Sequence, residues 1–221
     1  MVMNNPYSGP EDVPHVIAVF PLTGALLLPR GELPLNIFEP RYLAMIDDAM
    51  KSHRIIGMIQ PEEASSYRDA PGLLKIGCAG RITQIAETGD GRYVLTLTGI
   101  ARFRIIEEVS AMTAYRQCRI DFADFRTDFT PRMGENAVDR ESVLRTLRAF
   151  AEANQLQIDW NSIHEAANEA LVNALAMMSP YGPKEKQALL EAPDLKARAE
   201  VLVAITEIEL ARGKNASSPL Q

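Results

Sequence analysis

The sequence predicts an α+β protein, in which a mostly antiparallel β domain with one early helix is followed by a C-terminal α-helical bundle. Up to about residue 126, apolar residues come in short β-branched runs separated by turn residues. Beyond residue 136, they recur every three or four positions, which is the period of helices. Strands therefore precede helices, without the alternation of a doubly wound nucleotide-binding sheet.

The composition is that of an ordinary globular protein of one or two domains. The chain has 221 residues, of which 47% are hydrophobic and 24% are charged. Its formal net charge of -6 gives no general attraction to phosphate backbones, so nucleic acid is disfavoured as a partner. Because no apolar run approaches the roughly eighteen residues of a membrane span, we expect a cytoplasmic protein with no membrane partner.

Changes in composition and period divide the chain into five parts. The first is rich in Asn, Pro, Ser, Gly and acidic residues, which cannot bury enough apolar surface to become ordered. The expected parts are a flexible N-terminus at 1–14, a β domain at 15–126, a linker at 127–136, a helical subdomain at 137–212 and a tail at 213–221.

Two buried strands flank the early helix. Residues 15–20 and 54–61 are apolar runs that end at a proline. Between them, residues 39–52 place apolar side chains at helical spacing on one face. Pro40 suits the first helical position, and the Glu39 carboxylate can lie near the positive end of this helix.

A long hairpin occupies the centre of the β domain. Residues 74–87 and 92–99 flank the dipeptide Asp90-Gly91, which favours a tight turn because glycine accepts a positive φ. We expect separate strands at 101–109 and 114–125, giving roughly five or six strands in all. Two glycines of the first hairpin strand, Gly77 and Gly80, indicate a bulge or close packing.

Four helices are expected in the C-terminal part. The first contains Leu144, Leu147 and Ala151 at helical spacing. Ser162 and Glu165 form a capping-box pattern that opens the second helix, and Ser179-Pro180 closes it. The third covers 183–192, and the fourth runs from a cap at Asp194 to Gly213.

Sequence patterns of catalysis are missing. GxxxxGK[ST], GxGxxG, HExxH and GxSxG do not occur, so we expect no enzyme, no catalytic residue and no cofactor. The two cysteines, Cys78 and Cys118, are expected to be buried inert thiols, although a pairing with His15 or His53 stays open. With His164, the histidines show no ligand spacing, so no metal site is expected.

Charged residues of the hairpin region allow two interpretations. Arg102 and Arg104 alternate along one strand and would share a sheet face, with Arg81 and Arg92 on neighbouring strands. That face could bind an anion or RNA. The alternative is ordinary pairing with acids of the same region, because the pairs Glu62-Glu63 and Glu107-Glu108 are best explained as solvated acids.

Several segments together resemble the N-terminal substrate-binding domain of the ATP-dependent protease Lon. They are VFPLTGALLLPRGELPLNIFEPRY, IIGMIQ, IGCAGRITQIAETGDGRYVLTLTGIARFRI and EKQALLEAPDLKARAEVL, and the likeness covers about residues 15–212. The resemblance implies a PUA-like β domain, here as a stand-alone, non-enzymatic bacterial module. In Lon this module binds unfolded or tagged proteins and helps to assemble the hexamer, whereas ATP hydrolysis and the serine-lysine protease belong to other domains.

The resemblance implies an unfolded polypeptide or a partner protein as the ligand, and it allows a homo-oligomer. Because PUA-like folds elsewhere recognise RNA, nucleic-acid binding is the alternative function. The segment LPLNIFEPRY at 33–42 has two interpretations. In the structural one, Leu35 and Ile37 are core residues and Pro34 lies at a strand edge.

In the functional interpretation of the same segment, four residues bind polypeptide. An aromatic side chain and an arginine beside an open strand edge suit the capture of an extended peptide or of an apolar anchor. The residues of this predicted site are Phe38, Glu39, Arg41 and Tyr42.

Overall fold

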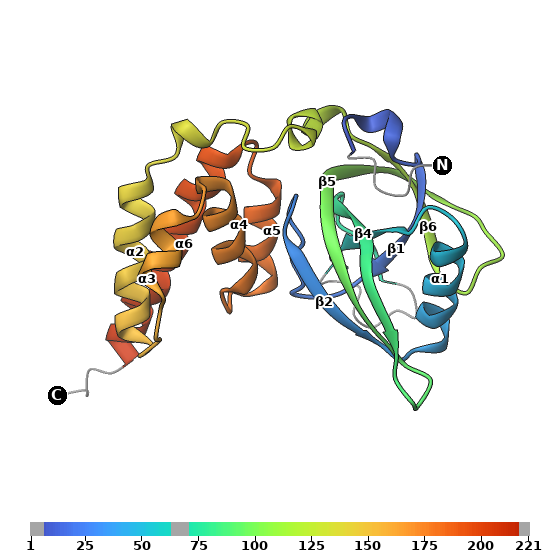
Figure 1. The fold of residues 1–221 in the computed structure, drawn as a ribbon, viewed down its shortest axis with the longest axis horizontal. Coiled ribbons are helices and arrows are strands. Elements are labelled where there is room, and N and C mark those ends of the chain that lie inside the picture. The colour runs from blue at the N-terminus through green and yellow to red at the C-terminus, as the bar shows by residue number, and fades with distance from the viewer. Residues whose placement is uncertain (1–6, 63–70, 217–221) are drawn as a thin grey trace.

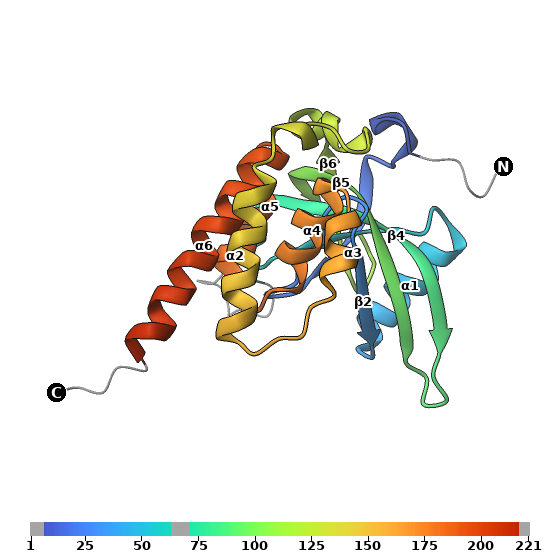
Figure 2. The same cartoon turned by 60° about the vertical axis from the view of Figure 1, so that its left-hand side comes forward.

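The structure, a computed structural model, describes residues 7–62 and 71–216. A β subdomain and a helical subdomain lie side by side (Figures 1 and 2), which confirms the predicted α+β class. The β subdomain contains β1 (Val16–Pro21), β2 (Glu32–Ile37), α1 (Pro40–Lys51), β3 (Ile55–Ile59), β4 (Ile76–Glu87), β5 (Tyr93–Val109) and β6 (Arg116–Asp121). The helical subdomain contains α2 (Arg140–Ala153), α3 (Trp160–Glu165), α4 (Asn168–Met178), α5 (Pro183–Glu191) and α6 (Leu195–Ala216).

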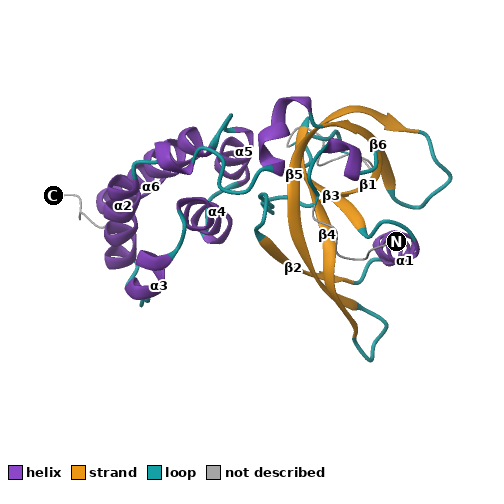
Figure 3. Cartoon of the chain, turned by 45° about the horizontal axis from the view of Figure 1, so that its top comes forward, coloured by secondary structure: helices purple, strands orange, loops and turns teal. Residues whose placement is uncertain are grey.

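One sheet closes into a barrel. Its strand order is β2-β5-β4-β3-β1-β6, and β5 also pairs with β6, so that β5, β4, β3, β1 and β6 form a ring (Figure 3). All pairings are antiparallel except that of β1 with β3. Strand β2 pairs with the first half of β5 and lies outside the ring, at the edge of the sheet.

Helix α1 covers the inner face of the β2-β5-β4 sheet. It begins at Pro40, as predicted, and buries Met45, Ile46 and Ala49. Leu35 and Ile37 of β2 belong to the same apolar cluster. This cluster continues into α4, α5 and α6, so the two subdomains share one core.

Strand β5 corrects the prediction of two separate strands, because it runs unbroken through Gly99. The segment Leu28–Gly31 packs against the strand at this point: Arg30 N donates to Gly99 O at 2.8 Å, and Gly99 N donates to Gly31 O at 2.9 Å. Gly99 is therefore a site of close backbone approach within a continuous strand. The predicted roles of the other two glycines are confirmed, since Gly77 touches Phe103 and Gly80 lies at a register shift.

The second predicted helix is in fact two helices. Helix α3 ends at Glu165, the backbone is extended at Ala166 and Ala167, and α4 then begins. The cap also differs from the prediction: Asp159, not Ser162, accepts the hydrogen bonds of the first turn of α3. Asp159 wins because its carboxylate accepts from two backbone amides and from the Ser162 hydroxyl.

The last two helices follow the sequence more closely. Helix α5 begins at Pro183, as predicted, and Asp194 accepts from the Ala197 amide at 2.8 Å to cap α6. Helix α6 continues past Gly213, where we expected it to end. In the parts of the chain that the structure describes, no helix is both long and apolar enough to cross a membrane.

The expected N-terminus and linker contain local structure. Residues 1–6, and 217–221 of the expected tail, lie outside the described residues, but Pro10–Asp12 forms a 3₁₀ turn and Val13 is buried. The linker region overlaps 3₁₀ helices at Ala123–Phe129 and Glu135–Ala137. The division into domains at 127–136 stays a prediction.

We expect Gly99→Ala to lower the free energy of unfolding by at least about 2 kcal/mol. The added Cβ would lie 2.0 Å from the Leu28 carbonyl oxygen, and both backbones are held there by hydrogen bonds. Urea denaturation followed by circular dichroism measures the change. Gly89→Ala is the matched control, because nothing lies within 4 Å of its added Cβ. Equal unfolding midpoints for the two variants would contradict this prediction.

Candidate functional site

A buried arginine of the barrel joins the two subdomains. Arg102 of β5 is 2% exposed, and its guanidinium donates to both carboxylate oxygens of Asp128 at 2.8 Å. The same group donates to the carbonyls of Leu190 at 3.0 Å and Ala192 at 2.5 Å, at the end of α5. It also lies over the Phe125 ring, 4.4 Å from the centroid. Strand β5, the 3₁₀ segment and α5 thus meet at one side chain.

This burial corrects the expectation of a basic face with Arg102 and Arg104. Arg102 is covered by the helical subdomain and neutralised by Asp128, so it cannot meet an external anion. Arg104 is half-exposed but pairs with Asp124. The other interpretation, cross-strand pairing of the acids, fits the geometry: Glu107 pairs with Arg119 and Glu108 with Arg116. Arg92 likewise pairs with Asp90.

A second set of polar contacts links the segment before β2 to α4. Arg30, at φ 63°, donates to the Asp128 carbonyl at 2.6 Å and to Glu169 Oε2 at 3.0 Å. Glu169 Oε2 also accepts from the Arg132 amide at 2.8 Å. Asn173 Nδ2 donates to the Pro29 carbonyl at 3.1 Å. These contacts hold the start of β2 at a fixed separation from α4.

Arg198 of α6 stabilises the same junction through hydrogen bonds to α4 and α5. It is 3% exposed and donates to Asn173 Oδ1 and to the Leu189 carbonyl, both at 3.0 Å. Burial, followed by the nearby charge of Arg102, lowers the pKa of Arg198 to about 10. The side chain is therefore still a cation at neutral pH. It orients the side-chain amide of Asn173, which donates to the Pro29 carbonyl before β2.

The junction leaves an open cleft between β2 and α4, of about 410 Å³. Figure 3 shows α4 on the side of the sheet that β2 borders. The walls are mostly apolar and come from both subdomains. They include Pro29, Pro131, Ala170, Ala174, Met177 and Met178. Met178 is 83% exposed, and Met177 packs where a Cβ on Gly31 would lie, 2.4 Å from its sulfur.

The predicted site around Phe38 is only partly on the surface. Phe38 is 59% exposed, with the Arg92 guanidinium 5.9 Å from its ring centroid. Glu39 and Arg41 are half-exposed and pair with each other at 2.8 Å, so the Glu39 carboxylate makes no capping hydrogen bond. Tyr42, in contrast, lies in the core against Phe20 and cannot line an exposed groove. Burial raises the pKa of its hydroxyl.

Sequence reasoning did not identify the cleft. Met178 fits the apolar period of α4, which is the pattern of a core-facing residue. Its exposure follows from where α4 lies against β2, which the period of one helix does not encode. The usable signal was weak: Met177 and Met178 lie about 100° apart around the helix, so one of them can leave the apolar face.

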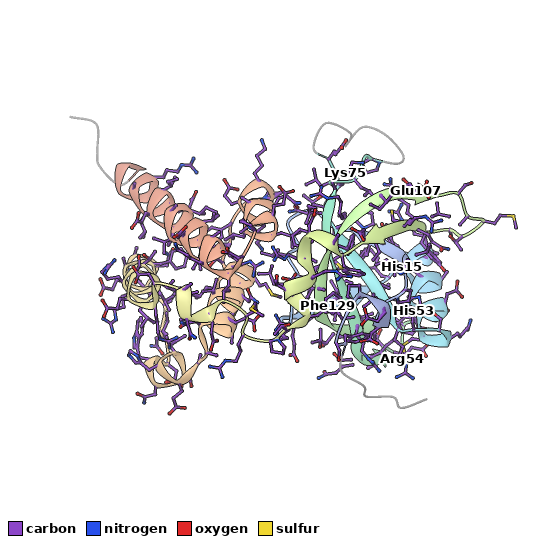
Figure 4. The ribbon with its side chains drawn as sticks, turned by 90° about the horizontal axis from the view of Figure 1, so that it is seen from above. His15, His53, Arg54, Lys75, Glu107 and Phe129 are labelled. Atoms are coloured by element: carbon purple, nitrogen blue, oxygen red, sulfur yellow. The ribbon has the colours of Figure 1, made fainter. Side chains whose placement is uncertain are left out.

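Among the described residues, the cysteines and histidines have no geometry for thiol or metal chemistry. Cys78 and Cys118 are both buried, as predicted. Burial is the main cause that raises the pKa of each thiol, to about 11 for Cys118. His53, which Figure 4 labels with His15 on the β subdomain, accepts from the Ile55 amide at 3.1 Å, and burial lowers its pKa. Within residues 7–62 and 71–216, no group of His, Cys, Asp or Glu could hold a metal ion.

Comparisons with known proteins agree on one family. The family model for the "ATP-dependent protease La (LON) substrate-binding domain" matches residues 16–207. The chain is 29% identical over 205 residues to Lon protease 2 of Myxococcus xanthus, with 88% of this chain and 24% of that protein covered. It is 30% identical over 206 residues to Lon protease of Parabacteroides distasonis, with 91% and 25% covered. The chain thus spans about a quarter of the length of these curated relatives.

Two solved structures have a similar fold. The Lon N-terminal domain protein from Xanthomonas campestris gives a TM-score of 0.60 at 20% identity, covering 86% of this chain and 97% of that one. The N-terminal domain of the Mycobacterium avium complex Lon protease gives 0.64 at 19% identity, covering 87% and 98%. At these identities the likeness shows the fold alone.

We expect Asp128→Ala to cost about 3–5 kcal/mol of unfolding free energy, because it leaves the Arg102 cation buried without its carboxylate. Denaturant titration measures the loss. Asp124→Ala is the control, since it breaks the half-exposed pair with Arg104 and should cost less than about 1 kcal/mol. Losses of similar size in both variants would contradict the role given to Arg102.

Neither thiol should react with iodoacetamide in the folded protein at pH 8. Burial keeps reagent out and disfavours the thiolate at both cysteines. Labelling followed by intact-mass spectrometry should show modification only after urea unfolds the chain. Fast labelling of either thiol in native buffer would show that a thiol is accessible.

Proposed function

Because this chain belongs to the family of the Lon substrate-binding domain, we propose that it is a non-enzymatic substrate-recognition module of the cytoplasm that binds unfolded polypeptides or partner proteins. The observation that carries the proposal is the open, methionine-lined cleft between β2 and α4. An exposed apolar cleft is costly to leave in water and is typical of a binding site.

The chemistry of the cleft suits clients of variable sequence. Met177 and Met178 have unbranched side chains that adapt to many apolar shapes, since three rotatable bonds and a polarizable sulfur tolerate different partners. Apart from Glu32, the charged residues at the rim are already paired within the protein, as in Arg30 with Glu169. A client therefore gains most from apolar burial, which demands no particular sequence.

The family match supports a role in binding. The match is to the substrate-binding domain, and the chain spans about a quarter of the length of its curated relatives. We propose that the bound polypeptide passes to a protease or chaperone.

We expect the protein to bind a reduced and alkylated, fluorescently labelled polypeptide, and Met178→Ser to weaken this binding about tenfold. Burial of a methionine side chain contributes about 1.5–3 kcal/mol, and about 1.4 kcal/mol corresponds to tenfold in the dissociation constant. Fluorescence anisotropy measures the affinity.

Met112→Ser is the matched control, because Met112 is fully exposed but lies in the loop between β5 and β6, away from the cleft. It should bind as the unchanged protein does. The proposal fails if the folded protein binds no unfolded polypeptide. An equal effect of the two substitutions would move the binding site away from the cleft.

A further inference from the structure

Strand β2 connects the cleft to Phe38. Glu32, the first residue of β2, lines the cleft, and Phe38 follows the last residue of the strand. The strand pairs with β5 on one side, and the helical subdomain lies on its other side (Figure 1). At about 3.4 Å per residue, Glu32 and Phe38 are about 20 Å apart.

The outer face of the sheet between these two ends is exposed and carries almost no charge. Glu32, Pro34 and Asn36 point to this face and pair with Thr98, Thr96 and Val94 of β5. Ala86 of β4 continues the row beside Val94. The Arg92 guanidinium over the Phe38 ring places both side chains at the far end of the same face. Arg81 of β4 pairs with Thr98 in the same row as Glu32. The face is therefore charged at its two ends and uncharged between them.

The edge of β2 is a poor template for a complete added strand. The hydrogen bond from Gly99 N to Gly31 O marks a hydrogen-bonded pair, so Leu33 and Leu35 also face β5 with their backbone groups. The backbone of Pro34 between them faces outward, where proline has no N–H to donate. A client laid along β2 therefore loses a central main-chain bond, and side-chain anchors must supply its affinity.

One charge on this surface has no partner. The carboxylate of Glu32 is exposed at the cleft and makes no hydrogen bond or ion pair with the residues that the structure describes. The other charges at the two ends are paired, as in Arg92 with Asp90 and Glu39 with Arg41. A client with a lysine or arginine next to its anchor in the cleft would complement Glu32.

We propose that β2 is a track for an extended polypeptide with two apolar anchors about six residues apart, the first in the cleft beside Met178 and the second on Phe38, and with a basic residue next to the first. Residues i and i+6 of an extended chain point to the same side, so both anchors can face the sheet at once. This inference rests on the proposed function and specifies its clients.

The test uses the full chain and fluorescein-labelled peptides of Gly, Ser and Thr that carry one leucine, or two leucines three, five or six positions apart, with Lys next to one leucine. We expect the six-position peptide to bind about tenfold more tightly than the single-leucine peptide, because a second buried anchor adds to the first. The other spacings should bind like a single leucine. Phe38→Ser and Met178→Ser should each abolish the advantage of six positions.

Controls and a charge exchange complete the experiment. Ile106→Ser and Met112→Ser, which alter exposed apolar residues elsewhere, should change nothing. Glu32→Lys should reverse the preference from peptides with Lys to the same peptides with Glu. Tight binding that is independent of spacing, of Phe38 or of the charge at position 32 would overturn the track and leave polypeptide binding intact. If neither these peptides nor an unfolded polypeptide bind, the proposed function itself fails.

Discussion

The buried contact between Arg102 and Asp128 is the interaction on which the rest of the structure depends. Taking two charges out of water is costly, and the cost is offset here because the guanidinium binds the carboxylate with two parallel hydrogen bonds and also satisfies two carbonyls of the helical subdomain. These hydrogen bonds are directional, whereas apolar packing alone would allow the helical subdomain to shift along the barrel. The contact therefore favours one orientation of the helices against the barrel, and the cleft lies where the two meet.

The continuous strand β5 connects this junction to β2. Its first half carries β2, and Arg102 and the pairing with β6 belong to its second half. Gly99 lies between them, where the segment before β2 folds back onto the strand and positions Arg30 toward α4. The proposed polypeptide-binding surface and the junction between the subdomains are therefore both attached to one strand. A change in the packing at Gly99 would alter both the position of β2 and the junction between the subdomains.

Local patterns were sufficient to predict most of the elements, because a helix or strand is encoded by the period of its own residues. The start of α1 at Pro40, the start of α5 at Pro183 and the turn at Gly91 with φ 77° all follow from short-range rules. Contacts between distant segments were not predictable in this way. Arg102 looks like a surface residue until α5 covers it, and Met178 looks like a core residue until α4 is seen at the cleft.

The same distinction applies within the predicted site: Phe38 is exposed, but the ring of Tyr42 is held in the core by Phe20, a residue far away in the sequence.

Pro34 also affects how copies of this protein can interact with one another. An exposed edge strand can also pair with the same strand of another copy of the protein, and repeated pairing of this kind builds fibrils. Pro34, in the middle of that edge, interrupts the repeating hydrogen-bond ladder that fibril growth requires, so the edge resists self-assembly even if, as proposed, the neighbouring surface binds other chains.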